Sequence, residues 1–176
     1  MANICSTAIQ FTGEEDALKD LFQRLDVGWL GNVAKEFDVQ ANTGGDIEDF
    51  DDEMYRVWQS DRWTPNVEIW QQIIDKYYKN KISFVYIAEE SGCGVFINTD
   101  ETGEYFPAKY MCDYAIGQES DVIYFEDEKE FVDWVKEKFC VNVSTEEEAI
   151  QAVDDFNYSC TTDEFCTVGV FENPEY

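Results

Sequence analysis

The sequence contains no histidine, and that absence removes several kinds of active site. Without an imidazole there is no Ser-His-Asp triad, no Cys-His dyad and no HExxH metal site. Basic residues are also few, with 12 Lys and Arg against 39 Asp and Glu and a formal net charge of −27. Affinity for a nucleic-acid backbone comes from Lys and Arg side chains that neutralise phosphates, so this charge argues against direct binding to nucleic acid. It argues equally against adhesion to anionic membranes.

Long apolar runs and closely paired cysteines are missing too. The N-terminal residues MANICSTAIQF lack the basic and long apolar regions of a signal peptide, and no apolar run approaches membrane-spanning length. We therefore expect a cytoplasmic protein. The six cysteines form no CxxC pair, and the tightest spacing is that of Cys160 and Cys166. This pattern favours reduced thiols that pack as small apolar side chains over a zinc site, and we expect no cofactor.

The chain has ample material for a packed core, because 44% of its 176 residues are hydrophobic and 16% are aromatic. The spacing of the apolar residues predicts a mixture of strands and helices. Strands are expected at residues 3–12, 54–61, 82–88, 94–98, 104–111, 122–125 and around 166–171. Helices are expected at residues 14–25, from Thr64-Pro65 to about 79, at 127–139, and at 145–156 after a Ser144-x-x-Glu147 capping box.

The order of these elements predicts an α+β fold. The first 99 residues give β-α-β-α-β-β with a long insertion after the first helix, which suits a ferredoxin-like split-βαβ antiparallel sheet with helices on one face. We expect residues 1–109 to form this domain. The insertion spans residues 26–53, and its Gly44-Gly45 pair and the six acids within 46–53 indicate a solvated acidic loop near 40–53. Residues 110–176 are expected to form an acidic α/β extension, which either continues the sheet or stands as a small appended unit.

Three short motifs resemble a known family. The opening ANICS…I.FTG and the segments YRVWQSDRWTP and ISFVYIAEESGCGVFIN occur in the same order as in a plasmid- and phage-encoded ferredoxin-like family typified by YubB. Asn3, Cys5 and Ser6 match its Met-x-Asn-x-Cys-Ser strand, and Trp63-Thr64-Pro65 matches its Trp-x-Pro junction before the second helix. The resemblance covers about residues 1–99. It implies a ferredoxin-like fold and an origin in a mobile element, and it brings no established activity, catalytic residue or cofactor.

The negative charge is distributed unevenly along the chain. Residues 54–88 hold three acids and five bases, whereas residues 110–176 hold 18 acids and three bases, with no base after Lys138. Duplex DNA carries about one charge per 1.7 Å of its axis, so the charge of the whole chain corresponds to roughly 45 Å, or about 13 base pairs. A protein with this density of carboxylates is suited to the basic groove of a DNA-binding protein.

The charge therefore predicts a non-enzymatic DNA mimic. In this interpretation it is an inhibitor from a phage or mobile element that occupies the nucleic-acid-binding surface of a host defence protein, of the restriction or CRISPR type. Phe50 and Tyr55 are candidate aromatic anchors beside the acids. The candidate partner-binding residues are acids from the insertion and from the starts of the two C-terminal helices: Asp46, Glu48, Asp49, Asp51, Asp52, Glu53, Glu126, Asp127, Glu128, Glu130, Glu146, Glu147 and Glu148.

Other interpretations stay open. Acids at helix starts are favoured by the helix dipole and by solubility, so the chain is alternatively a structural or regulatory binding module whose charge only keeps it soluble. A second alternative is a carboxylate metal-dependent enzyme, although DIEDFDDE lacks the residue order of an EF-hand loop. Cys93 is the one thiol expected in an exposed loop, and a tight hairpin explains its flanking glycines better than a nucleophile site does.

Overall fold

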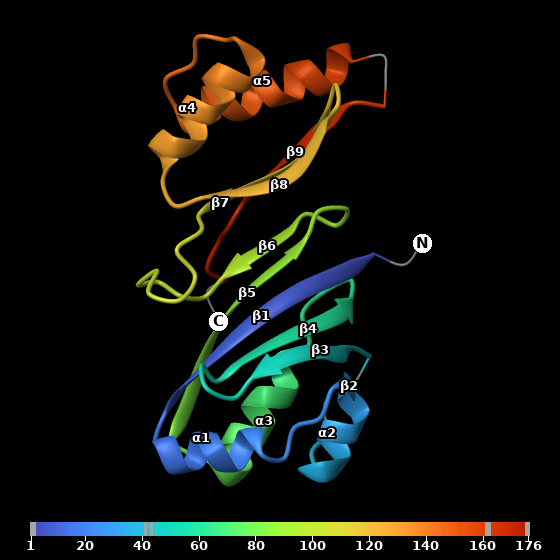
Figure 1. Ribbon diagram of the computed structural model, residues 1–176, viewed down its shortest axis with the longest axis vertical. Helices are drawn as coiled ribbons and strands as arrows, with labels where there is room; N and C mark the ends of the chain where they lie inside the picture. Colours follow the sequence, from blue (N-terminus) through green and yellow to red (C-terminus); the bar gives the residue numbers. More distant parts are fainter. Residues whose placement is uncertain (1–2, 41, 43, 161–162, 175–176) are drawn as a thin grey trace. The chain divides into compact units, whose positions relative to one another are not determined.

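The computed structural model describes residues 3–40, 42, 44–160 and 163–174. It divides the chain into two compact units, Met1–Asp100 and Glu101–Tyr176, each with a hydrophobic core of its own (Figure 1). Among the helices of the described residues, none has the length and apolar character needed to cross a membrane.

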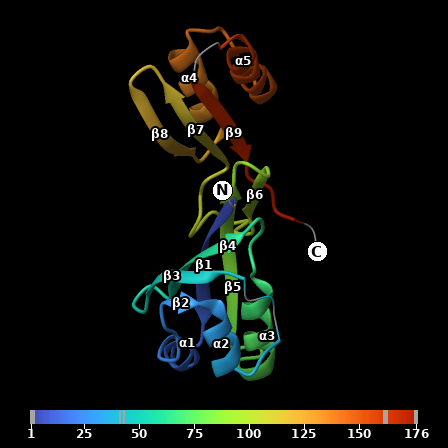
Figure 2. The ribbon, with the colours of Figure 1, turned by 90° about the vertical axis from the view of Figure 1, so that its right-hand side faces the viewer.

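The first unit contains a six-stranded antiparallel sheet with three helices on one of its faces (Figures 1 and 2). The strands lie in the order β2-β3-β4-β1-β5-β6. Within it, the order β3-β4-β1-β5 is that of a ferredoxin-like split-βαβ sheet, so the predicted α+β fold class is confirmed. The elements of this unit are β1 (Ile4–Gly13), α1 (Glu15–Phe22), β2 (Gly28–Trp29), α2 (Leu30–Glu36), β3 (Asp46–Asp51), β4 (Arg56–Arg62), α3 (Glu68–Tyr77), β5 (Ile82–Glu90) and β6 (Val95–Asn98).

The core of the first unit lies between the sheet and the three helices. Alternate residues of β1 are buried on this side, and Phe11 is the largest of them. Its ring meets Phe22 of α1 and Trp70 of α3 edge to face, at centroid distances of 5.7 and 5.3 Å. These contacts fix both helices against the central strand, and the opposite face of the sheet carries the other residues of the alternation, among them Ala8, Trp58 and Ile87.

The prediction of a solvated acidic loop near residues 40–53 is wrong, because the insertion at residues 26–53 contains β2, α2 and β3. The acidic run DIEDFD is strand β3, which pairs with β4. Its apolar residues Ile47 and Phe50 are three positions apart, a spacing that does not fit the two-residue period of a strand. A β-bulge between Ile47 and Asp49 adds one residue, so both apolar side chains face the helices, opposite Gln59 and Val57.

A buried carboxylate holds the connection between β4 and α3. Asp61 is 1% exposed and accepts hydrogen bonds from Gln59 Nε2 (2.6 Å), Asn66 Nδ2 (2.6 Å) and the Asn66 backbone N–H (3.1 Å). Gln59 in turn accepts a bond from Trp70 Nε1 at 2.9 Å. Because Asn66 is held in this connection, α3 begins at Glu68, and the helix start predicted at Thr64-Pro65 is wrong.

The second unit is a three-stranded antiparallel sheet, in the order β8-β7-β9, with two helices packed on one face (Figures 1 and 2). Phe131 is fully buried at its centre and stacks on Tyr110 at a centroid distance of 4.9 Å. Asn157 pairs its side-chain amide with the backbone N–H and C=O of Cys166, at 2.9 and 2.7 Å, and so ties the last helix to the edge strand. The elements are β7 (Tyr110–Ile116), β8 (Glu119–Phe125), α4 (Glu128–Phe139), α5 (Glu146–Ser159) and β9 (Phe165–Val170).

Two boundaries predicted in this unit are also wrong. The strand expected at 104–111 begins only at Tyr110, because the segment before it contains Pro107, which has no N–H for a sheet hydrogen bond. The capping box lies one residue later than predicted. Thr145 accepts the bond from the Glu148 N–H, at 3.3 Å, and is therefore the N-cap of α5.

A candidate protein-binding surface

The N-termini of α4 and α5 meet in the second unit. Cys140 ends α4 in a left-handed conformation, and the short segment after it returns the chain to the beginning of the same helix. The backbone N–H of Glu146 then donates to Glu128 Oε1 at 3.2 Å, and the hydroxyl of Tyr110 donates to Glu146 Oε2 at 2.8 Å. Two acidic clusters separated in the sequence thus form one surface. We call it the acidic surface, and its residues are Glu126, Asp127, Glu128, Glu130, Glu146, Glu147 and Glu148.

Backbone N–H groups at the helix starts hold several of these carboxylates in place. Asp127 accepts a bond from the Glu130 N–H at 2.9 Å, and Glu130 Oε2 accepts one from the Glu126 N–H at 3.1 Å. Glu148 accepts bonds from the hydroxyl and the backbone N–H of Ser144, and these bonds lower the pKa of its carboxyl below the usual value. The partial positive charge of two helix N-termini offsets the repulsion between these carboxylates and explains how so many of them gather without a paired basic side chain.

The pKa of Tyr110, which lies beneath this surface, reflects the negative charge of the surface. Burial, the hydrogen bond to Glu146 and the nearby charges of Glu146, Glu128 and Asp127 all raise the pKa of its hydroxyl. The phenol therefore stays protonated and serves as a hydrogen-bond donor to Glu146.

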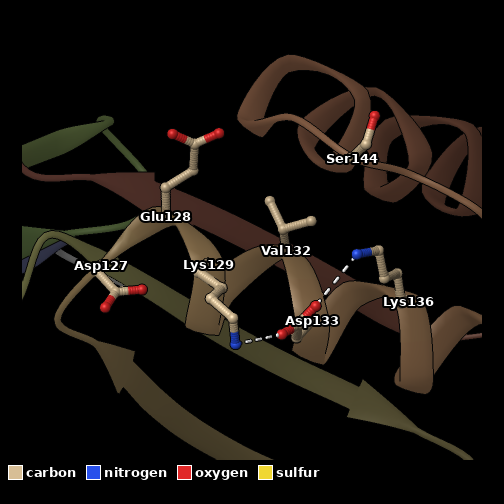
Figure 3. A pocket seen from close by; sticks show the side chains of 7 residues that line it. All are labelled: Asp127, Glu128, Lys129, Val132, Asp133, Lys136 and Ser144. Carbon is tan, nitrogen blue, oxygen red and sulfur yellow. Dashed lines mark hydrogen bonds and ion pairs between the residues drawn. The ribbon is translucent and has the colours of Figure 1, made fainter.

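The nearby lysines are engaged by other acids. Lys129 and Lys136 both bind Asp133, at 2.9 and 3.1 Å, inside an open groove of about 320 Å³ along α4 (Figure 3). Glu128 points away from both lysines in the same view. In the part of the chain that the structure describes, none of the thirteen candidate acids forms an ion pair, so their charges remain available to a partner.

The other six candidate acids belong to the first unit. Asp46, Glu48, Asp49 and Asp51 lie on β3, and Asp52 and Glu53 lie in the turn that follows it. Asp51 Oδ1 accepts bonds from the N–H groups of Glu53 and Met54 and shapes this turn, at 2.9 and 2.8 Å. The structure thus places the thirteen acids in two sets, one on each unit.

The two candidate aromatic anchors are turned toward the core. Phe50 and Tyr55 pack against the ring of Phe22, with centroid distances of 6.2 and 5.4 Å. The sequence analysis did not single out Trp58 as a candidate contact residue, although it lies on the opposite face of the sheet from Phe50. Its position between the buried residues Val57 and Gln59 indicates this orientation, because neighbouring residues of a strand face opposite sides.

Comparison with protein families, with curated proteins and with solved structures finds no match for this chain. The resemblance of residues 1–99 to the YubB-type family therefore stays a prediction. Among the described residues there is no group of three or more His, Cys, Asp or Glu side chains arranged to hold a metal ion. The cysteines are free thiols, of which Cys5, Cys112 and Cys166 are buried and Cys93 and Cys140 are exposed.

Proposed function

We propose that this protein is a non-enzymatic inhibitor that binds a basic nucleic-acid-binding protein through the acidic surface and competes with DNA or RNA. The observation that carries the proposal is the meeting of two acidic helix N-termini, which gathers seven carboxylates without an ion-pair partner among the described residues. The second unit, with 20 acids and four bases, adds to the same negative field. The setting we propose is the host cytoplasm, with a mobile element as the source and a restriction or CRISPR protein as the target.

The physical basis is that the groove of a nucleic-acid-binding protein attracts negative charge whatever the nucleotide sequence. Lys and Arg side chains in such a groove gain their affinity by neutralising phosphates, and fixed carboxylates offer them the same charge. Long-range attraction also speeds the encounter between oppositely charged surfaces, most strongly at low salt. A partner held mainly in this way must lose affinity steeply as the salt concentration rises.

A capture experiment tests the proposal directly. The protein is immobilised, host lysate is passed over it at low and at high salt, and the bound proteins are eluted with duplex DNA. We expect a basic nucleic-acid-binding protein that is retained at low salt, lost at high salt and displaced by DNA. If no such protein is retained, the proposal is contradicted, and the charge is better explained as a means of keeping the protein in solution.

Neutralising three acids of the surface is expected to weaken partner binding about tenfold at 0.15 M salt, with a shallower dependence on salt. The variant is Glu126→Gln, Glu128→Gln and Glu147→Gln. Glutamine keeps the acceptor oxygen that Glu128 offers to α5, so the fold is preserved. Titration calorimetry over a range of salt concentrations measures both quantities.

The matched control removes the same number of charges from exposed positions outside the acidic surface. It carries Glu137→Gln, Asp154→Asn and Asp155→Asn. We expect it to retain most of the affinity. Equal losses in the two variants would show that only the total charge matters and would contradict a defined surface.

A further inference from the structure

The face of the first unit's sheet that lies opposite the helices, here called the open face, carries a half-buried tryptophan beside an acid. Trp58 lies on β4, and its neighbours Val57 and Gln59 are buried on the helix side, so its ring faces the other way. Across the sheet its direct partners are Asp49 on β3 and Ala8 on β1. The ring is therefore flanked by a carboxylate on one side and by a methyl group on the other.

Two more acids line the same part of this face. The β-bulge directs Glu48 to the open side, where it accepts a hydrogen bond from the hydroxyl of Ser60. Asp46 lies directly opposite Ser60 and is exposed. We call this set the Trp58 face, and it consists of Asp46, Glu48, Asp49, Trp58 and Ser60. Among the described residues, Trp58 has no stacking or cation–π contact, unlike Phe37 at the end of α2 and Tyr77 at the end of α3, whose rings lie near Arg24.

We propose that the Trp58 face binds an arginine or lysine side chain from an exposed segment of the basic protein partner. A cation over an indole ring is attracted by the negative face of the ring, and tryptophan is the best of the aromatic residues for this contact. The three carboxylates add charge attraction on the same face and give the bound cation hydrogen-bond acceptors, although Arg56, two residues from Trp58 on this side of β4 and bonded to Gln10, offsets part of their charge. The inference rests on the proposed function, because it assumes a basic partner, and it adds a second contact site on the other unit.

The acids also decide which occupant this face selects. A nucleic-acid strand would stack on the ring but would bring its phosphates close to Asp46, Glu48 and Asp49, where like charges repel. An apolar segment would bury the same carboxylates without an opposite charge, which is costly. A cationic side chain satisfies both the ring and the acids.

The indole N–H signals of the five tryptophans test the inference residue by residue. We would titrate the ¹⁵N-labelled full chain at 0.15 M salt with an octa-arginine peptide and, separately, with an oligothymidine strand. The peptide is expected to shift the Trp58 signal, identified from Trp58→Phe, more than that of Trp63, which is 52% exposed at the end of β4. A Trp58 signal that responds only to the oligothymidine, or to neither ligand, would overturn the inference.

A pair of variants separates this site from the acidic surface. Trp58→Leu keeps an apolar side chain without the aromatic ring and is expected to weaken peptide binding at this face about threefold. Trp63→Leu, the control, leaves it unchanged. If the octa-arginine peptide binds Trp58→Leu as tightly as it binds the wild type and loses affinity only in the Glu126→Gln, Glu128→Gln, Glu147→Gln variant, the Trp58 site is wrong and the proposed function stands. If the wild-type chain shows no binding to the peptide at either site, both proposals fail.

Discussion

Replacing Asp61 with alanine is expected to destabilise the first unit by about 3 kcal/mol. The side chain is 1% exposed and accepts three hydrogen bonds, two from Asn66 and one from Gln59. Alanine would leave all three donors buried without an acceptor, and each such donor costs about 1 kcal/mol or more. The loss is partly offset because a buried carboxylate is itself costly to desolvate.

Chemical denaturation with the Trp70 indole as the probe measures this loss, because Trp70 is bonded to Gln59 in the same network. Asp61→Asn is the informative comparison, since asparagine keeps one acceptor oxygen and should cost about 1 kcal/mol. Asp26→Ala removes a carboxylate that is exposed and is expected to change the stability by less than 0.5 kcal/mol. A loss in Asp61→Ala no larger than that in Asp26→Ala would show that the network does not hold the junction.

The pH dependence of stability in the wild type and in Asp61→Asn tests the direction in which the pKa of Asp61 is shifted. Burial raises the pKa of Asp61 above its ordinary value of 3.8, while the bonds from Gln59 and Asn66 lower it in part. The Asp61 carboxyl therefore binds a proton more tightly in the folded chain than in the unfolded chain. The wild type accordingly gains stability as the pH falls through the raised pKa toward 3.8. Asp61→Asn has no proton to bind at this position. The difference in unfolding free energy between wild type and Asp61→Asn should accordingly grow on acidification, and a difference that shrinks would contradict the assignment.

The elements that the sequence predicts well are those whose apolar residues keep a regular period. β1, β5, α4 and α5 follow the expected spacing closely, and the split-βαβ order of the first unit could be inferred from them. β3 was missed because the bulge at Glu48 breaks its alternation, and because acids fill its exposed positions. A bulge depends on pairing with another strand, so a local pattern does not reveal it.

The acidic surface shows the same limit at the level of a site. Both acidic helix starts could be recognised from the sequence, since acids at N-termini follow from the helix dipole. Their meeting depends on the path of residues 140–145 back along α4 and on the bonds of Glu146 to Glu128 and Tyr110. Such contacts between distant segments arise from packing of the core around Phe131. A sequence pattern carries no direct record of them.

Replacing Phe131 with alanine is expected to destabilise the second unit by about 4 kcal/mol. Its ring is fully buried, lies parallel to that of Tyr110 at a centroid distance of 4.9 Å, and meets Phe125 at 5.8 Å. Its removal leaves a cavity under the strand that carries Tyr110, whose hydroxyl holds Glu146. A unit of 76 residues has a total stability of only about 4 to 11 kcal/mol, and a strong excess of negative charge lowers it further. Most of the margin of the second unit is therefore lost.

The tryptophans make the consequence visible in each unit separately. Trp134 is the one tryptophan of the second unit, and its ring contacts Tyr114 and Phe125, whereas Trp70 reports on the first unit. In Phe131→Ala, we expect the unfolding transition reported by Trp134 to shift to a lower denaturant concentration, whereas the midpoint of the transition reported by Trp70 should not change. Phe165→Ala removes the same side chain from a position that is 41% exposed, and it should cost less than 1 kcal/mol. Because the acidic surface depends on this core, Phe131→Ala should also weaken partner binding by at least the roughly tenfold expected for the triple glutamine variant, under conditions where the first unit remains folded. Retention of binding by a chain whose second unit has unfolded would place the partner's contacts on β3 and the Trp58 face instead.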